Sequence, residues 1–150
     1  MEENGLKTLK VFLGGTCNGS EWRKEIKNYF CAEVDYFDPV VPDWNEEAQD
    51  EERRQRAICN ICLYVLTPKM AGFYSIAEVV QDSMKKPERT MLCILDEDGD
   101  ARWTKQQAYS LQAVSNMVFG NGATTTKGLK EAASKINSFA KAFTNWTGDA

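Results

Sequence analysis

The sequence contains no histidine. This absence excludes a Ser-His-Asp triad, a Cys-His dyad, a zinc site with histidine ligands and any histidine general base. Any catalysis must therefore depend on carboxylates, hydroxyl groups, lysine, arginine, tyrosine or the backbone. Long apolar runs are missing as well, since none approaches the roughly 18 residues of a membrane span. The first ten residues are polar and lack the basic and then apolar pattern of a signal peptide, so we expect a cytoplasmic protein without a membrane partner.

Cysteine and basic charge are also limited. Five cysteines are an odd number for a disulfide framework, and four of them lie in or beside apolar runs, which predicts buried free thiols. The 18 Lys and Arg residues are outnumbered by 22 Asp and Glu residues, and a formal net charge of -4 gives no reason to expect binding to a nucleic-acid polymer. With 150 residues of ordinary composition, we expect one domain over residues 1–150 that needs no metal or disulfide to hold its core.

Short apolar runs alternate with longer amphipathic ones along the chain. The apolar runs predict buried strands at residues 9–14, 33–37, 61–66 and 90–95, with a loop or short edge strand at 120–126. The amphipathic runs predict helices at 20–30, 44–57, 73–85, 103–118 and 127–143, and an exposed acidic turn at 96–100. This alternation predicts an α/β fold with right-handed crossovers and a mainly parallel sheet. In such sheets ligands bind beyond the carboxyl ends of the strands, so we expect a site after the first three strands.

The loop after the first strand is the first candidate site. It runs from Gly14 to Ser20 (GGTCNGS), and its glycines would let a ligand approach the backbone beside a helix that Ser20 is predicted to cap. Thr16, Asn18 and Ser20, together with Arg23, could hold a phosphate. The pattern is neither GxGxxG nor a P-loop, and a tight turn without a ligand is the alternative.

The second candidate loop follows the second strand. Asp43 is predicted to cap the next helix, with Glu46 three residues later as in a capping box. Trp44 could stack on a planar base, or it could be a core tryptophan held by the helix cap. The charges that follow, up to the basic run Arg53–Arg56, predict pairs between neighbouring helical turns on a solvated face.

The third candidate segment runs from Thr67 to Glu78 (TPKMAGFYSIAE). On a helical wheel, the apolar residues within about 60° of Phe73 predict the core-facing stripe, namely Ile76, Ala77, Val80 and Met84. Glu78 lies about 140° away, so periodicity alone predicts a surface acid. Glu78 nevertheless stands about two turns from the loop, and the positive end of the helix would favour the ionised form that a nucleophilic carboxylate needs.

One further motif has little functional content. Cys59 and Cys62 form a CxxC by letter only, because they lead into a buried strand, whereas redox pairs stand at the start of a helix. A second pair that would complete a zinc site is missing. We therefore expect no metal and no cofactor.

Together the three loops resemble a known family. The strand ending LGGT, the segment FDPVVPDW, and the strand, loop and helix ICLYVLTPKMAGFYSIAEV are similar to the nucleoside 2-deoxyribosyltransferase-like family, as is the Lys86-Pro87 entry into TMLCIL. The resemblance covers roughly residues 9–96. It implies a flavodoxin/Rossmann-like three-layer sandwich with a four- to five-stranded, mainly parallel sheet. Family members cleave the N-glycosidic bond of deoxynucleosides or their 5′-phosphates, with a glutamate attacking the anomeric carbon.

The resemblance assigns Glu78 as the catalytic nucleophile. A carboxylate nucleophile and an oxocarbenium-like transition state need no histidine, which agrees with the composition. The three loops supply the predicted substrate-binding residues Gly14, Gly15, Thr16, Asn18, Ser20, Asp43, Trp44, Met70, Gly72, Tyr74 and Ser75. Family transferases usually carry an acidic residue several positions before the glutamate, whereas residues 69–72 read KMAG here.

Two classes of function follow most directly from these observations, and a structural or interaction protein that uses only the scaffold is a third possibility. The first is an N-glycosyl transferase or hydrolase that acts on a nucleoside or nucleotide. The second, which the absent acid favours, is a non-catalytic nucleotide-binding module on the same fold. In both cases the expected partner is a small molecule, and the resemblance leaves association into a homo-oligomer open.

Overall fold

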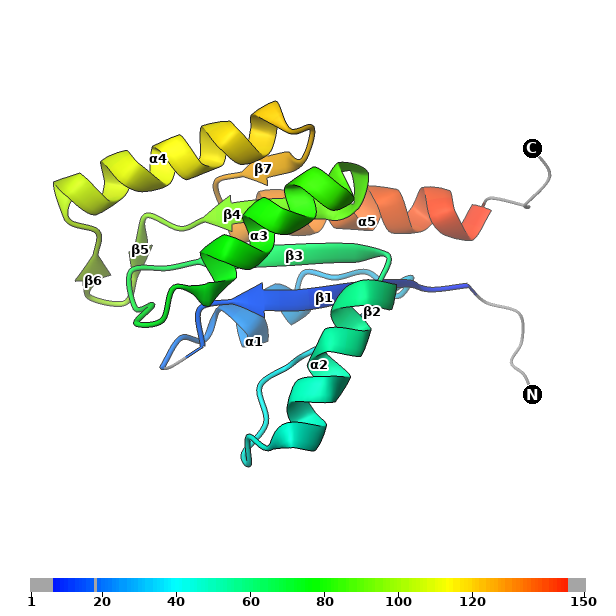
Figure 1. The fold of residues 1–150 in the computed structure, drawn as a ribbon. Coiled ribbons are helices and arrows are strands. Elements are labelled where there is room, and N and C mark those ends of the chain that lie inside the picture. The colour runs from blue at the N-terminus through cyan, green and yellow to red at the C-terminus, as the bar shows by residue number, and fades with distance from the viewer. Residues whose placement is uncertain (1–6, 18, 146–150) are drawn as a thin grey trace.

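The structure is a computed structural model and describes residues 7–17 and 19–145. Five strands form one parallel sheet, which helices cover on both faces (Figure 1). The strands are β1 (Leu9–Gly15), β2 (Val34–Phe37), β3 (Ile61–Leu66), β4 (Thr90–Ile94) and β7 (Thr124–Thr126), in the order β2-β1-β3-β4-β7. The predicted α/β class, the flavodoxin/Rossmann-like layers and the parallel sheet are thereby confirmed.

The helices complete the outer layers. They are α1 (Trp22–Lys27), α2 (Glu46–Ile58), α3 (Tyr74–Lys85), α4 (Lys105–Gly120) and α5 (Leu129–Asn145), with a 3-10 turn η1 at Pro87–Arg89. After β4 the chain adds a short antiparallel hairpin, β5 (Glu97–Asp98) and β6 (Ala101–Arg102). None of the helices in the described part of the chain is long and apolar enough to cross a lipid bilayer.

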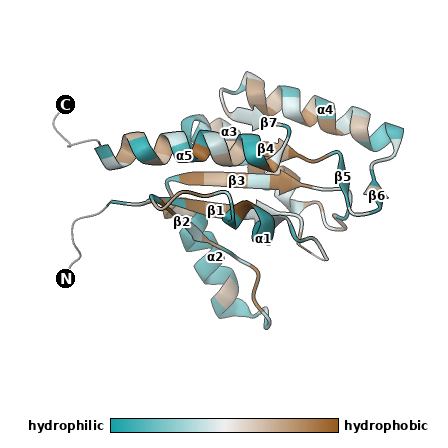
Figure 2. Ribbon diagram, turned by 180° about the vertical axis from the view of Figure 1, so that it is seen from behind, coloured by the Kyte–Doolittle hydropathy of each residue, from teal (hydrophilic) through white to brown (hydrophobic). Residues whose placement is uncertain are grey.

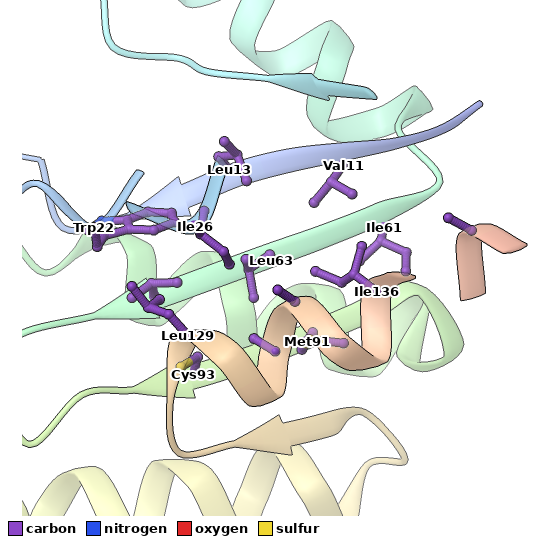
Figure 3. Close-up of a cluster of buried hydrophobic side chains, with 14 of the residues drawn as sticks. Val11, Leu13, Trp22, Ile26, Ile61, Leu63, Met91, Cys93, Leu129 and Ile136 are labelled. Atoms are coloured by element: carbon purple, nitrogen blue, oxygen red, sulfur yellow. The ribbon is translucent and has the colours of Figure 1, made fainter. Parts of the chain in front are cut away.

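Alternating side chains of the central strands supply two cores, one on each face of the sheet. Leu13 and Leu63 face α1 and α5, where Trp22 and Ile136 pack against them (Figure 3). Tyr64 and its neighbours on the opposite face pack against α3 and α4. All of β3 is buried, as its continuous apolar run predicted, and Figure 2 shows hydrophobic residues concentrated in these strands.

The strand order places the predicted site. From β1 the chain first turns outward to β2 and then crosses to β3 on the other side, and the helices α1 and α3 that follow β1 and β3 pack on opposite faces of the sheet. A crevice at such a switch in strand order is where doubly wound sheets bind ligands.

Two predicted helix caps are wrong. Ser20 does not cap α1, because the helix begins at Trp22 after Glu21, and the Ser20 hydroxyl donates instead to Asp98 (2.6 Å). Asp43 does not cap α2, because Asn45 has the extended backbone of a cap and its Oδ1 accepts from the amide of Ala48 at 2.8 Å. Before α2 the sequence offers both Asp43 and Asn45 as caps and only the course of the backbone selects Asn45, whereas no side chain caps α1.

Ile76 and Val80 of the predicted stripe on α3 pack against the core, but the rest of the stripe is exposed. Phe73 and Met84 are each 69% exposed, whereas the buried residues of the helix are Glu78, Val79, Asp82 and Ser83. Hydrophobic periodicity missed the buried polar face of this helix, which lies against Arg56 of α2 and Tyr64 of β3.

The acidic turn at 96–100 is only partly exposed. Asp98 on β5 keeps 15% of its side chain exposed and accepts hydrogen bonds from Ser20 and from the Thr67 hydroxyl (2.7 Å). Lys69 lies 3.8 Å from Asp98 and donates to the carbonyl of Gly19. The hairpin therefore ties the loop after β1 to the loop after β3.

We expect Gly15→Ala to lower the free energy of unfolding by about 2 to 4 kcal/mol. Gly15 has a φ of 120°, and an added Cβ would lie 2.0 Å from the carbonyl oxygen of Val65 on the neighbouring strand. Urea denaturation followed by circular dichroism measures the change. Gly120→Ala is the matched control, because open space surrounds Gly120, and this variant should stay within about 1 kcal/mol of the parent. Equal stability of the two variants would contradict the steric argument.

Candidate functional site

A cavity of about 440 Å³ opens at the carboxyl ends of β1 and β3. This size falls within the range of small-molecule sites. All three predicted loops contribute to its wall. The lining residues are Gly14, Gly15, Thr16, Cys17, Arg23, Pro39, Val40, Val41, Trp44, Glu52, Met70, Ala71, Gly72, Tyr74, Ser75 and Glu78.

Most of the predicted site residues meet in this cavity. The exceptions are Ser20 and Asp43, which lie outside its lining, and Asn18, which lies outside the described residues. Ser20 is bound to Asp98, and Asp43 is exposed in the loop before α2.

The first loop is held tightly against β3. The amide of Thr16 donates to the Val65 carbonyl, and the Thr16 hydroxyl accepts from the amide of Thr67, both at 2.9 Å. A Cβ on Gly14 would lie 2.8 Å from the ring of Tyr64, so glycine is required here for packing, as it is at Gly15. The tight-turn interpretation therefore accounts for both glycines, although both also line the cavity.

The guanidinium of Arg23 is hydrogen-bonded to the protein backbone. Its guanidinium donates to the carbonyls of Leu13 (3.0 Å) and Thr16 (2.7 Å), and it lies 3.6 Å from Asp38. Burial lowers the pKa of Arg23, while Cys17 and Asp38 oppose this shift. The structure thus uses Arg23 to close the turn after β1, and it does not bring Arg23 and Ser20 together around a free anion site.

Trp44 is 54% exposed and lines the cavity. This exposure excludes the alternative of a core tryptophan. Val40 (53% exposed) and Val41 (40% exposed) lie on the same wall and give it an apolar, aromatic character. Such a surface suits the flat face of a nucleobase.

Glu78 points into the molecule, which corrects the surface position that periodicity predicted. It is 9% exposed and lines the cavity from the second turn of α3. Burial raises its pKa from 4.5 to about 7; Arg56 opposes this shift, while Glu52 and Asp82 add to it. Near neutral pH, the carboxyl group therefore exchanges a proton readily and, when ionised, is poorly solvated.

Sequence reasoning missed two residues beside Glu78, both on α2. Glu52 lines the cavity, and burial raises its pKa, against the opposing charges of Arg23, Arg56 and Arg53. Arg56 lies 3.8 Å from Glu78. The predicted solvated face holds for Arg53 and Arg54, which pair with acids one turn earlier, but not for Arg56. Nothing in the charge pattern of α2 indicated which of its three arginines would face the interior.

Three of the four cysteines that the sequence predicted to be buried thiols are buried. Cys59, Cys62 and Cys93 are buried, and burial raises the pKa of each thiol to about 11, which keeps it protonated. Cys31 is half-buried and Cys17 is exposed at the cavity. Among the described residues, no three Cys, Asp or Glu side chains are placed to hold a metal ion.

Glu78→Gln should stabilise the protein increasingly as the pH rises. Because the pKa of Glu78 is higher in the folded state, its contribution to stability is fully present below about pH 4.5 and is lost as the pH passes 7. We expect the stability difference between variant and parent to grow by about 3 kcal/mol from pH 4 to pH 8, measured by urea denaturation. Glu88→Gln, at an exposed position, is the control. A difference that is equal at both pH values would contradict the burial of a titrating Glu78.

Comparison with known proteins agrees with this geometry. A family model described as nucleoside 2-deoxyribosyltransferase like matches residues 8–96. That span contains β1 to β4, the three loops and Glu78. No curated protein and no solved structure gives a significant match. Since the matched residues make up more than half of the sequence, the chain belongs to the nucleoside 2-deoxyribosyltransferase-like family.

Proposed function

We propose that the protein cleaves or transfers at the N-glycosidic bond of a (deoxy)nucleoside or nucleotide, with Glu78 as the nucleophile. The observation that carries this proposal is the burial of the Glu78 carboxyl group in the cavity at the β1–β3 switch point. Membership of the family supports the class of substrate.

In the proposed reaction a carboxylate oxygen of Glu78 attacks the anomeric carbon while the bond to the base breaks. The base leaves with the electron pair of that bond and takes up a proton. The resulting glycosyl ester is then attacked by water, which gives hydrolysis, or by a second base, which gives transfer. A poorly solvated carboxylate favours the first step, because little water must be displaced from it.

Glu52 is the candidate proton donor for the departing base. It lines the same cavity as Glu78, and two neighbouring carboxyl groups cannot both ionise easily. The mechanism requires Glu52 to carry the proton while Glu78 is ionised, and the burial that raises the pKa of Glu52 supports this role. An acid from α2 would thus provide a carboxyl group that residues 69–72 do not supply.

The remaining lining residues have proposed roles in binding. Trp44, with Val40 and Val41, would contact the base, and Gly14 to Thr16 would lie against the sugar. Met70, Gly72, Tyr74 and Ser75 border the cavity beside Glu78 and would bound the sugar on its other side. For Asn18, Ser20 and Asp43, substrate binding stays a prediction, as does association into a homo-oligomer.

The alternative is a nucleotide-binding module without turnover. The sequence KMAG before α3 favours it, because no acid in that stretch would orient the sugar. The two proposals differ in one product, the free base.

Glu78→Gln should reduce release of free base at least about 1,000-fold, because the amide cannot form the glycosyl ester. Chromatography of reactions with a panel of deoxynucleosides and their 5′-phosphates measures the product. Glu88→Gln, which changes an exposed carboxylate, should retain the parental rate. Unchanged release by Glu78→Gln would contradict the mechanism, and tight binding without release by the parent protein would favour the module.

The pH dependence provides an independent test. A nucleophile must be ionised, and burial raises the pKa of Glu78 to about 7. We therefore expect kcat/KM to fall about tenfold for each pH unit below 7. A profile that stays flat from pH 5 to pH 8 would show that Glu78 is not the ionising group.

A further inference from the structure

Arg56 reaches from α2 to the inner face of α3, behind the cavity. Its Nη1 lies 3.8 Å from Oε2 of Glu78, and the two side chains are only 17% and 10% exposed. Arg56 is not among the residues that line the cavity. It can therefore act on a bound molecule only through residues that line the cavity, and Glu78 is the one it approaches at 3.8 Å.

Two buried side chains, Asp82 and Tyr64, accept hydrogen bonds from the guanidinium of Arg56. Nη2 and Nε donate to the two carboxylate oxygens of Asp82 at 2.9 and 3.1 Å, which is a bidentate pair. Nε also donates to the hydroxyl of Tyr64 (3.0 Å), and that hydroxyl donates to Asp82 (2.6 Å). Tyr64 is fully buried on β3, so the position of Arg56 is fixed against the central strand.

The same side chain also contacts the backbone that carries Glu78. Nη2 donates to the carbonyl oxygen of Glu78 at 3.2 Å and to Oε1 of Gln81 at 2.9 Å. Two nitrogens of one rigid group, Nε and Nη2, thus hold the turn from Glu78 to Asp82, while Nη1 faces the carboxylate of Glu78.

We infer that Arg56, held by Asp82 and Tyr64, is a positioning residue that keeps the Glu78 carboxylate in place and ionised for attack. This inference rests on the proposed function. It adds a residue that acts through the nucleophile and does not itself touch the substrate.

The charges around Glu78 support this role. Glu52 from α2 and Asp82 from α3 both disfavour its ionised form, and Arg56 is the largest opposing influence on its pKa after burial. Burial alone would lower the pKa of Arg56, but its bonds to Asp82 and Tyr64 outweigh burial and raise that pKa. Arg56 therefore stays charged throughout the pH range in which Glu78 titrates.

The direct test is titration of Glu78 by NMR, in protein carrying ¹³C at the side-chain carboxyl carbon of glutamate. The Glu78 signal is assigned by its loss in Glu78→Gln. Arg56→Met should move its midpoint upward by at least about one pH unit, since a cation 3.8 Å away is removed. Arg54→Met is the matched control on the same helix, because Arg54 is exposed and pairs with Glu51, and it should leave the midpoint unchanged. An unchanged midpoint in Arg56→Met would overturn the inference.

Activity gives a second readout. The acid limb of kcat/KM for the best deoxynucleoside of the panel should shift upward with the midpoint in Arg56→Met, and the rate should recover at high pH, where Glu78 is ionised again. Arg56→Lys, which keeps the charge, should restore part of the shift. A lower plateau without a shifted limb would indicate a merely structural role and overturn the inference.

Arg56→Met leaves Asp82 buried without its cation, which can prevent folding. The double variant Arg56→Met/Asp82→Asn removes both charges, keeps an acceptor for Tyr64, and should still raise the Glu78 midpoint, because Arg56 influences Glu78 more strongly than Asp82 does. The results of these experiments distinguish a failure of this inference from a failure of the proposed function. If Glu78→Gln retained base release while Arg56→Met shifted the titration, the catalytic proposal would fail and the electrostatic pairing would stand.

Discussion

Carboxylates buried against a protein core are costly unless a cation and hydrogen-bond donors meet them, and this constraint orients α3. Asp82 and Glu78 occupy the inner face of that helix because Arg56 and Tyr64 are there to receive them. Phe73 and Met84, at the two ends of the predicted apolar stripe, are left facing outward.

The cavity itself follows from how closely β1 and β3 approach each other. Glycine at positions 14 and 15 lets the end of β1 lie against Tyr64 and Val65, and Thr16 then bonds across to Thr67. Hydrogen bonds that Ser20 and Thr67 donate to Asp98 of the hairpin hold the same two loops together from outside. Two residues that the sequence suggested for ligand binding instead hold the loop after β1, since Ser20 bonds to Asp98 and Arg23 bonds to backbone carbonyls. Trp44 and Glu78 remain directed at the cavity.

Much of the fold could be predicted from local patterns. Continuous apolar runs located the central strands to within a residue or two, because a strand covered on both faces has no polar positions. The helix caps were harder, since neighbouring Asp43 and Asn45 can both cap and only the backbone path distinguishes them. The role of α2 was missed for a related reason: Arg53, Arg54 and Arg56 are equivalent in the sequence, yet only Arg56 faces α3.

By itself the sequence determined the parallel sheet, the three loops after its first strands and the absence of histidine chemistry, because these depend on composition and on patterns within single elements. The resemblance carried by those loops identified Glu78, against its helical periodicity. Only the tertiary structure decided that Glu78 is buried, that Glu52 shares its cavity and that Arg56 pairs with it. Those facts depend on the rotation of α2 and α3 about their axes, which is set by contacts between residues 22 to 26 positions apart in the chain.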